Sequence, residues 1–290
     1  MTSQLAPFPH LDDFPVQAVA SNKKGLTVSV CLPARDEEAT IGCIVSGIRR
    51  QLMEEAGLVD ELLVVDDGST DSTAELAEEA GGRVVSSASV LPEYGTGLGK
   101  GQAMWKAVHE TSGDLIVFCD ADVTNFDPRF VAALIGALIS SEDHALVKAV
   151  YSRSLNGQPG SGGRVTELVA RPLLRTLFPE LAHIRQPLAG EMAAHRQVLD
   201  QLPFCEGYGV ELGLLIDAAS RFGPQAVGQV DLGARSHRNR PLHELSPQAL
   251  DIIQVALQRA GVSHNHAGTL FGLSERPPLL DVPSYGRRSA

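Results

Sequence analysis

Two carboxylates spaced one residue apart follow a short apolar segment in the middle of the chain. We expect Leu115–Cys119 to form a buried strand, and Asp120 and Asp122 come directly after it. Ligand crevices of open α/β sheets form at the carboxyl ends of strands, where side chains two positions apart lean to one side. Their oxygens suit Mg²⁺ or Mn²⁺, which usually completes its coordination with substrate phosphates. The pair therefore indicates a metal-diphosphate site, although Asp is also frequent at strand ends that bind no metal.

Two more polar turns follow predicted strands. Residues 33–38 read Pro-Ala-Arg-Asp-Glu-Glu, and residues 66–71 read Asp-Asp-Gly-Ser-Thr-Asp. A carboxylate such as Glu37 or Asp67 could accept a hydrogen bond from a base or a ribose, which is how nucleotides are usually selected. Alternatively, these residues only cap or charge the following helix N-termini. Placement at a strand end favours nucleotide binding for Asp67, and both interpretations stay open for Glu37.

A glycine-rich segment, residues 95–101, contains one basic residue, Lys100. Small residues let backbone N–H groups approach phosphate oxygens, and a lysine supplies a point charge. The segment lacks the order of a P-loop, and it follows the third predicted strand, so a dinucleotide fingerprint also fails. Whether Lys100 contacts a donor phosphate therefore stays open.

Two segments of the second half could bind anions. Glycines precede Arg164 and Thr166 at the start of a predicted helix, where a guanidinium and a hydroxyl would suit a phosphorylated or carboxylated acceptor. A flexible linker is the alternative. Residues 235–240 read Arg-Ser-His-Arg-Asn-Arg, in which His237 could be a third metal ligand and the arginines could hold phosphates. The neighbouring arginines favour a functional role for His237 over a structural one.

The elements that must position these residues alternate along the chain. We predict strands near Leu26–Leu32, Leu62–Val65, Val84–Val85, Leu115–Cys119, Ala145–Tyr151 and Ala226–Leu232, and helices near residues 41–52, 72–80, 102–110, 128–140, 165–177, 209–221 and 247–260. Such alternation predicts an α/β fold with a mainly parallel sheet covered on both faces. We expect residues 1–24 to form an extended arm and residues from about His264 to pack loosely.

Length, charge and cysteines bound the class of protein. The chain has 290 residues and a formal net charge of -11, which argues against a general nucleic-acid surface. No run of about 18 apolar residues and no signal peptide is found, so we expect a cytoplasmic protein without membrane contact. Cys31, Cys43, Cys119 and Cys205 lack Cys-x-x-Cys spacing and are predicted to be free thiols.

Taken in order, the motifs resemble those of nucleotide-sugar glycosyltransferases with the A-type fold. They are Pro-Ala-x-x-Glu, Val-Val-Asp-Asp-Gly-Ser-Thr-Asp, Gly-x-Gly-Lys-Gly, Asp-Ala-Asp and His-Arg-Asn-Arg. More specific are residues 163–168, 187–191, 207–211 and 234–240, which are similar to segments of the actinobacterial glucosyl-3-phosphoglycerate synthases, with mannosyl-3-phosphoglycerate synthases as close relatives. The resemblance spans about Leu26 to Ala260.

The resemblance implies a retaining transfer of glucose from UDP-glucose to the 2-hydroxyl of 3-phosphoglycerate, with Mg²⁺ as cofactor and Mn²⁺ or Co²⁺ as substitutes. By motif position it implies donor binding by Pro33, Ala34, Glu37, Asp67, Lys100, Asp120, Ala121, Leu188, Gly190, Tyr208 and Arg235. It implies acceptor binding by Gly163, Arg164, Thr166 and Asn239, and metal binding by Asp122 and His237. Asp122, Glu211, Glu191 and Lys100 are the candidate catalytic residues.

The same resemblance implies a Rossmann-like, mainly parallel sheet with a C-terminal acceptor-binding region, in a homodimer. We divide the chain into an arm (1–24), a nucleotide-sugar half (25–152), an acceptor half (153–262) and a tail (263–290). Ala121 stands where relatives often carry Ser, and Arg35 stands at a usually apolar position, but neither change removes a ligand.

Other functions remain open at this stage. The donor could instead be GDP-mannose, as for a mannosyl-3-phosphoglycerate synthase, or GDP-glucose. Glucose and mannose differ in the orientation of one hydroxyl, which the sequence does not distinguish. A noncatalytic nucleotide-sugar-binding protein is a further alternative. A nucleotidyltransferase is disfavoured, since its glycine-rich loop usually follows the first strand directly. Retention without an obvious nucleophile favours departure and attack on one face of the sugar over a covalent intermediate on Glu191 or Glu211.

Overall fold

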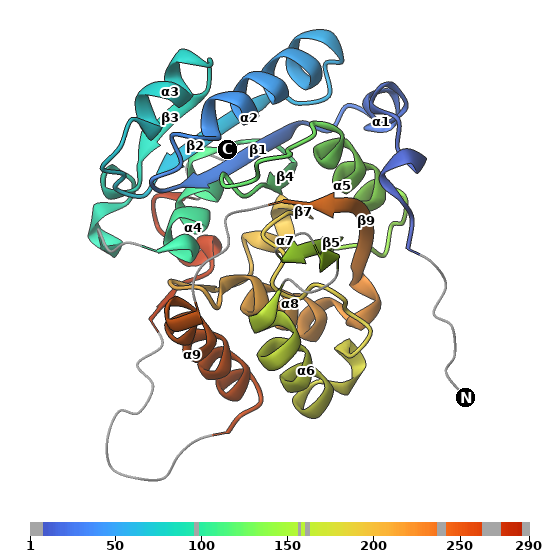
Figure 1. Cartoon of the computed structure of the whole chain (residues 1–290), viewed down its shortest axis with the longest axis vertical. Coiled ribbons are helices and arrows are strands. Elements are labelled where there is room, and N and C mark those ends of the chain that lie inside the picture. The colour runs from blue at the N-terminus through green and yellow to red at the C-terminus, as the bar shows by residue number, and fades with distance from the viewer. Residues whose placement is uncertain are drawn as a thin grey trace.

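The computed structural model describes residues 8–95, 99–155, 158–159, 163–236, 242–262 and 274–285, and strands alternate with helices over most of this length (Figure 1). The strands are β1 Val28–Ala34, β2 Glu61–Asp66, β3 Arg83–Ser86, β4 Leu115–Phe118, β5 Leu146–Leu155, β6 Gln158–Pro159, β7 Met192–His195, β8 Phe204–Cys205, β9 Val227–Arg235 and β10 Glu275–Arg276. The α-helices are α1 Val16–Asn22, α2 Ile41–Ile48, α3 Thr73–Glu79, α4 Lys100–Glu110, α5 Arg129–Ile139, α6 Arg171–Leu177, α7 Arg196–Leu199, α8 Val210–Phe222 and α9 Leu242–Arg259. Two π-helical segments, η2 Arg49–Glu55 and η5 Thr166–Ala170, continue into or out of these helices.

One mixed sheet organises the molecule. Its order is β3-β2-β1-β4-β7-β5-β6, and β9 pairs with β5 off this path. Strands β3, β2, β1 and β4 are parallel, β7 runs antiparallel between β4 and β5, and β9 is parallel to β5. The predicted α/β fold with a mainly parallel sheet is confirmed. Strand β7 is an addition that the sequence pattern did not indicate.

Helices cover both faces of the sheet, and the covering side changes at β1. Helices α2, α3 and α5 pack on one face, while α4, α6 and α8 pack on the other (Figure 1). The connection from β1 to β2 therefore uses one face and the connection from β3 to β4 the other. Such a reversal opens a crevice at the carboxyl ends of the flanking strands, here β1 and β4. The polar turns after these two strands lie at that crevice.

Residues 8–24 and 274–285, near the two ends of the chain, are more ordered than their composition indicated. The expected extended arm contains α1, which packs against α5, and Phe14 fits against Gly136, where a larger residue would overlap its ring. In the expected loose tail, β10 pairs with β8, and Leu279, Val282 and Tyr285 are buried. Both expectations were wrong for these residues, because tertiary packing stabilises segments whose local sequence has little periodicity.

Helix α9 begins at Leu242, five residues before the predicted start at Pro247, which lies inside the helix. The division at residues 152 and 153 stays a prediction, and strand β5 spans it to pair with β9. All four cysteines are free, as predicted, and Cys31, Cys119 and Cys205 are buried. No helix in the described part of the chain combines the length and apolar character needed to cross a membrane.

Candidate active site

The carboxyl ends of β4 and β9 bring one arginine against three carboxylates. Nη2 of Arg235, the last residue of β9, lies 2.7 Å from Oδ2 of Asp120, 3.2 Å from Oδ1 of Asp122 and 3.0 Å from Oε1 of Glu191. Nη1 donates a hydrogen bond to the hydroxyl of Tyr151 at 2.9 Å, and the guanidinium carbon lies 5.1 Å from that ring. The predicted Asp pair and Arg235 therefore share one site.

Lys100 closes the other side of this cluster. It is the first residue of α4, and its Nζ lies 2.5 Å from Oδ1 of Asp120 and 2.6 Å from Oε1 of Glu211. Burial alone would raise the pKa of Asp120, but Lys100 and Arg235 outweigh it and hold that pKa well below its ordinary value. Asp120 is therefore a permanent anion between two cations.

The turn before β7 completes the cluster with Glu191, which is almost fully buried. Neither carboxylate oxygen of Glu191 accepts a hydrogen bond from the described residues, although Arg235 lies close by. Burial raises the pKa of Glu191, and the charge of Arg235 opposes this shift. Gly190 fits tightly, because a Cβ there would overlap Asp120 and the ammonium of Lys100. Leu188, in the same turn, is half-buried against the core.

The ends of β1 and β2 supply an unsatisfied acceptor. Oδ2 of Asp67 accepts a hydrogen bond from the backbone N–H of Gly99 at 2.7 Å, whereas Oδ1 is buried without a partner among the described residues. Burial raises the pKa of Asp67, and the bond from Gly99 opposes this. The backbone N–H of Asp67 bonds to the carbonyl of Ala34 at 2.9 Å, so the ends of β1 and β2 are joined. Pro33 pairs with Val65 of β2, while pairing with β4 ends at Cys31.

The acidic residues around Glu37 have local structural roles. Oδ1 of Asp36 accepts a hydrogen bond from the backbone N–H of Thr70 at 2.7 Å, and Oε2 of Glu38 accepts one from that of Ser72 at 3.2 Å. These bonds lock the turns after β1 and β2 together. The backbone N–H of Glu37 donates to Thr73 at 2.8 Å, and Glu37 begins the turn that leads into α2.

The glycine-rich segment is described on both sides of residues 96–98. Gly99 has φ of 148° and packs against the carbonyl of Glu206, which also accepts a hydrogen bond from the backbone N–H of Gly101 at 3.1 Å. These contacts tie the start of α4 to the turn that carries Tyr208, whose backbone N–H bonds to Asp251 at 3.0 Å. They hold Lys100 close to Glu211, at the start of α8.

The predicted acceptor residues are only partly described. Gly163 has φ of 77°, Arg164 follows it in a helical turn, and Thr166 is buried at the start of η5. Among the described residues, Thr166 makes no hydrogen bond to Lys100 or to the carboxylates of the cluster, namely those of Asp120, Asp122, Glu191 and Glu211. Asn239 and His237 lie outside the described residues. The chain just before them is anchored, because Ser236 bonds to Thr124 at 3.1 Å and to Asn125 at 2.7 Å.

The described residues fit a divalent metal in part. No group of three potential ligands is assembled among them. Asp122 does offer carboxylate oxygens, which are hard ligands. Its Oδ1 lies 3.2 Å from Arg235, and its side chain is 29% exposed. A single carboxylate with an open side suits Mg²⁺, which retains water and substrate phosphates as its other ligands.

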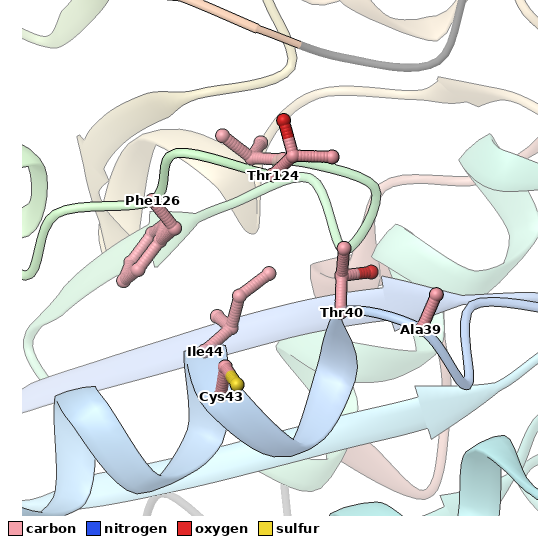
Figure 2. Close-up of a pocket in the computed structure, with 7 residues that line it drawn as sticks. Ala39, Thr40, Cys43, Ile44, Thr124 and Phe126 are labelled. Carbon is pink, nitrogen blue, oxygen red and sulfur yellow. The ribbon is translucent and has the colours of Figure 1, made fainter.

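A pocket of about 220 Å³ lies beside the Asp-Ala-Asp turn, between α2 and the chain after Asp122 (Figure 2). It is lined by Ala39, Thr40, Cys43, Ile44, Val123, Thr124 and Phe126. None of these residues is charged, so the pocket offers nothing to neutralise a diphosphate. Its wall supports the Asp-Ala-Asp turn instead, since Oγ1 of Thr40 donates a hydrogen bond to the carbonyl of Ala121 at 2.5 Å.

Two residues near the cluster were missed from the sequence, namely Tyr151 and Lys148. Both lie on β5, and Lys148 is buried within a strand that was predicted from its apolar pattern. A lysine inside a buried strand is rarely structural filler, because burying its charge costs free energy unless partners offset it. That contrast was the available signal.

Comparison with known proteins identifies the family. The model of Glycosyl transferase family 2 matches residues 29–201. A glucosyl-3-phosphoglycerate synthase of Petrotoga mobilis is 46% identical, over 91% of this chain and 89% of the relative. The crystal structure of the Mycobacterium tuberculosis glucosyl-3-phosphoglycerate synthase in complex with Mn²⁺, UDP-glucose and phosphoglyceric acid has a TM-score of 0.81 and 44% identity, over 96% of each chain. A second structure of that enzyme, with Mg²⁺ and UDP, has a TM-score of 0.81 and 44% identity, over 94% of this chain and 96% of the other. The chain therefore belongs to glycosyl transferase family 2 and, within it, to the glucosyl-3-phosphoglycerate synthases.

Proposed function

We propose that this protein transfers glucose from UDP-glucose to the 2-hydroxyl of 3-phosphoglycerate with retention of configuration and with Mg²⁺ as cofactor. The observation that carries the proposal is the cluster of Lys100, Arg235, Asp120 and Asp122 at the carboxyl ends of β4 and β9. It occurs in a chain 44% identical to an enzyme whose structure holds Mn²⁺, UDP-glucose and phosphoglyceric acid. Binding of a nucleotide sugar and stabilisation of its leaving diphosphate need this combination of fixed cations and metal-binding carboxylates in one crevice.

The uridine is assigned to the ends of β1 and β2. Oδ1 of Asp67 is buried without a partner among the residues described, and a buried carboxylate oxygen is costly unless a ligand donates to it. The imide N–H of uracil is such a donor. Pro33, Ala34 and Glu37 line the same strand ends and complete the proposed base and ribose site.

Asp122 and His237 are the proposed metal ligands. The assignment is supported by Ser236, the residue before His237, which is hydrogen-bonded to Thr124 and Asn125, two and three residues after Asp122. A bound divalent ion would act as a Lewis acid on the diphosphate that leaves with UDP. Arg235 and Lys100 supply fixed positive charge on the same side of the donor, while Ala121, Leu188, Gly190 and Tyr208 complete its proposed pocket.

Glu191 and Glu211 are proposed to position the donor sugar and not to attack it. Each carboxylate is almost fully buried and lies beside a cation, Arg235 at 3.0 Å and Lys100 at 2.6 Å respectively. A carboxylate held in this way is a poor nucleophile, because attack would cost its ion pair. Departure of UDP and attack by the acceptor hydroxyl on one face is therefore preferred. A glycosyl adduct trapped on either Glu would contradict this assignment.

The acceptor is assigned to Gly163, Arg164, Thr166 and Asn239. A guanidinium and a hydroxyl at the start of a helical segment suit the phosphate and carboxylate of 3-phosphoglycerate. Substitution Arg164→Ala should raise the KM for 3-phosphoglycerate at least about tenfold, as expected for loss of one charge-assisted bond, with a much smaller change in the KM for UDP-glucose. Equal changes in both constants would place the acceptor elsewhere.

We also propose a homodimer, as the resemblance implies. Two exposed leucines, Leu168 on η5 and Leu250 on α9, lie on segments that pack against each other and offer apolar surface. Light scattering on the purified protein would measure the mass directly. A monomer at micromolar concentration would contradict this part of the proposal.

The proposed reaction is tested by offering UDP-glucose, GDP-glucose and GDP-mannose separately with 3-phosphoglycerate. Mass spectrometry should find UDP and glucosyl-3-phosphoglycerate with Mg²⁺ present, and neither product after EDTA treatment. Preference for GDP-mannose would support the mannosyl alternative. Binding of UDP-glucose without any product would support a noncatalytic protein, and pyrophosphate release would support a nucleotidyltransferase.

A further inference from the structure

A buried lysine on β5, Lys148, lies beneath the carboxylate cluster. Only 1% of its surface is exposed, and it shares a face of the sheet with Leu146, against the layer that contains α4 and α8. Its Nζ donates a hydrogen bond to the backbone carbonyl of Ala189 at 2.5 Å. Ala189 precedes Gly190 and Glu191, so the lysine reaches the turn that borders the proposed sugar pocket.

Strand β5 holds this turn from two positions. Lys148 binds the carbonyl of Ala189 through its side chain, and the backbone N–H of Ala149 binds the carbonyl of Glu191 at 3.1 Å. Gly190 lies between these two anchors and against Asp120 and Lys100, with no room for a Cβ. A shift of the turn would therefore move directly into the ion-paired cluster.

Charges surround the ammonium group of Lys148 from several elements. Glu211 of α8, Lys100 of α4, Asp120 after β4 and Glu191 before β7 all influence it. On β9, the residue paired with Lys148 is the uncharged Gln229. Burial lowers the pKa of Lys148 to about 8, and Glu211 opposes the shift while Lys100 adds to it. The group is therefore charged at neutral pH and becomes neutral a little above it.

The charge of Lys148 also improves the balance of the site. Asp120, Asp122, Glu191 and Glu211 are four acidic groups, whereas Lys100 and Arg235 are two basic ones. Several carboxylates in one low-dielectric site repel one another unless cations offset them. A third cation leaves a smaller negative excess, which the proposed metal at Asp122 would then offset.

We infer that Lys148 is a positioning residue for glucosyl transfer, which holds the Ala189–Glu191 turn and stabilises the ionised carboxylates that border the donor sugar. This inference rests on the proposed function. Lys148 is 1% exposed and is hydrogen-bonded to the turn, so its effect should fall on kcat and on the donor, with little change in the KM for 3-phosphoglycerate.

The test compares Lys148→Met and Lys148→Arg with a control on the same strand, Val147→Ala. Val147 is fully buried but belongs to the core on the opposite face of the sheet. At pH 7, we expect Lys148→Met to lower kcat by about ten- to a hundredfold, the scale of a small misplacement at a reacting centre, and Val147→Ala to leave it nearly unchanged. Thermal unfolding of each variant verifies that it is folded.

The pH profile separates a charged role from a merely structural one. Wild-type kcat should decline above about pH 8, as Lys148 loses its proton, and Lys148→Arg should move this decline upward by at least one pH unit, because arginine stays charged. A wild-type enzyme that forms no product would contradict the proposed function itself. With an active wild type, kcat of Lys148→Met equal to that of Val147→Ala would overturn the inference. If Lys148→Met does not fold, superimposable alkaline declines for wild type and Lys148→Arg would overturn it.

Discussion

Asp120 is the residue around which the candidate site is built. Both of its oxygens are engaged by cations, Oδ1 by Lys100 and Oδ2 by Arg235, so it is charged and fixed before any ligand binds. Enzymes that stabilise developing charge rely on groups oriented in advance, because reorientation during the reaction costs free energy. Asp122, by contrast, keeps an open side. The two acidic residues of one motif therefore differ in what they leave free. Both oxygens of Asp120 are paired, and its contact with the donor stays a prediction, whereas Asp122 is more open to the proposed metal.

Gly190 gives the sharpest test at the scale of single residues. A Cβ at this position would overlap Asp120 and Lys100, so Gly190→Ala should displace the pair and lower kcat/KM for UDP-glucose by about a hundredfold. Gly42→Ala is the control, because its Cβ would meet only the carbonyl of Leu76, at 3.8 Å. Steady-state kinetics of both variants check the expectation. Equal kcat/KM in the two variants would show that the close packing at Gly190 does not affect activity.

Some site residues could be predicted from sequence and others could not. Asp120, Asp122 and Asp67 follow recognisable strands, so their type and position indicated a role. Glu191 was assigned by family resemblance alone, and Arg235 was predicted only as one of three arginines that could hold phosphates. Their meeting depends on the order of β7 and β9 in the sheet. Lys148 was missed because its proposed role depends on a hydrogen bond to Ala189 and on the influence of charges far away in the chain.

At the scale of elements, periodicity predicted the strands and helices that have it. Strands β1, β2 and β4 are apolar and buried, and helices α2, α5 and α8 carry apolar residues at helical spacing. Strand β7 escaped prediction because it has only four residues, two of them alanines, which have low β-propensity. It is a strand because β4 and β5 offer unpaired backbone groups on either side.

An ion-pair network joins the C-terminal segment to the helices. Arg259 of α9 contacts Asp217 of α8 at 2.7 Å and Glu275 of β10 at 2.6 Å. Its removal would leave two partly buried carboxylates without their partner, so Arg259→Met should lower the free energy of unfolding by about 2 to 3 kcal/mol, less than for a fully buried pair. Urea denaturation followed by circular dichroism measures this change.

The control for Arg259 is the more exposed pair between Arg171 and Glu167, four residues apart on one helical segment. Such a pair contributes at most about 0.5 kcal/mol, so Arg171→Met should have almost no effect. Similar losses in both variants would mean that the network does not anchor the C-terminal segment.

At the scale of the whole molecule, charge is distributed unevenly. The chain carries a formal net charge of -11, yet its candidate site holds Lys100, Lys148 and Arg235. An anionic donor would therefore meet Lys100 and Arg235 within an acidic protein, while the four carboxylates beside them leave a small negative excess for the proposed metal to offset. This separation could be predicted only in part, because net charge says nothing about which lysines the fold buries.

Two carboxylates at the amino ends of the strands, opposite to the candidate site, should make the protein sensitive to acid. Thr27 donates two hydrogen bonds to Asp114, each 2.8 Å long, and these lower the pKa of Asp114. Burial would raise the pKa of Glu61, but hydrogen bonds from Ser112 and Ser29 outweigh it and lower that pKa. Because both pKa values are lower in the folded state, the unfolded state binds more protons. Stability should be full above about pH 5 and decline as pH falls toward 3.

The acid sensitivity is measured by urea denaturation between pH 3 and pH 7. The double variant Glu61→Gln, Asp114→Asn should show a shallower decline in the free energy of unfolding below about pH 5, since the protonation difference is removed. The exposed Glu142 provides the control, and Glu142→Gln should keep the wild-type slope. Identical slopes in all three proteins would contradict the assignment.

The most direct test of the account is the rate of glucosyl-3-phosphoglycerate formation by wild type and by Asp122→Ala, with Mg²⁺, UDP-glucose and 3-phosphoglycerate supplied together. A metal that stabilises the leaving diphosphate contributes several kcal/mol to the transition state, so the variant should be about a thousandfold slower while its thermal unfolding is unchanged. The wild type should stop when EDTA is added. A folded Asp122→Ala protein that forms product at the wild-type rate would contradict the central claim.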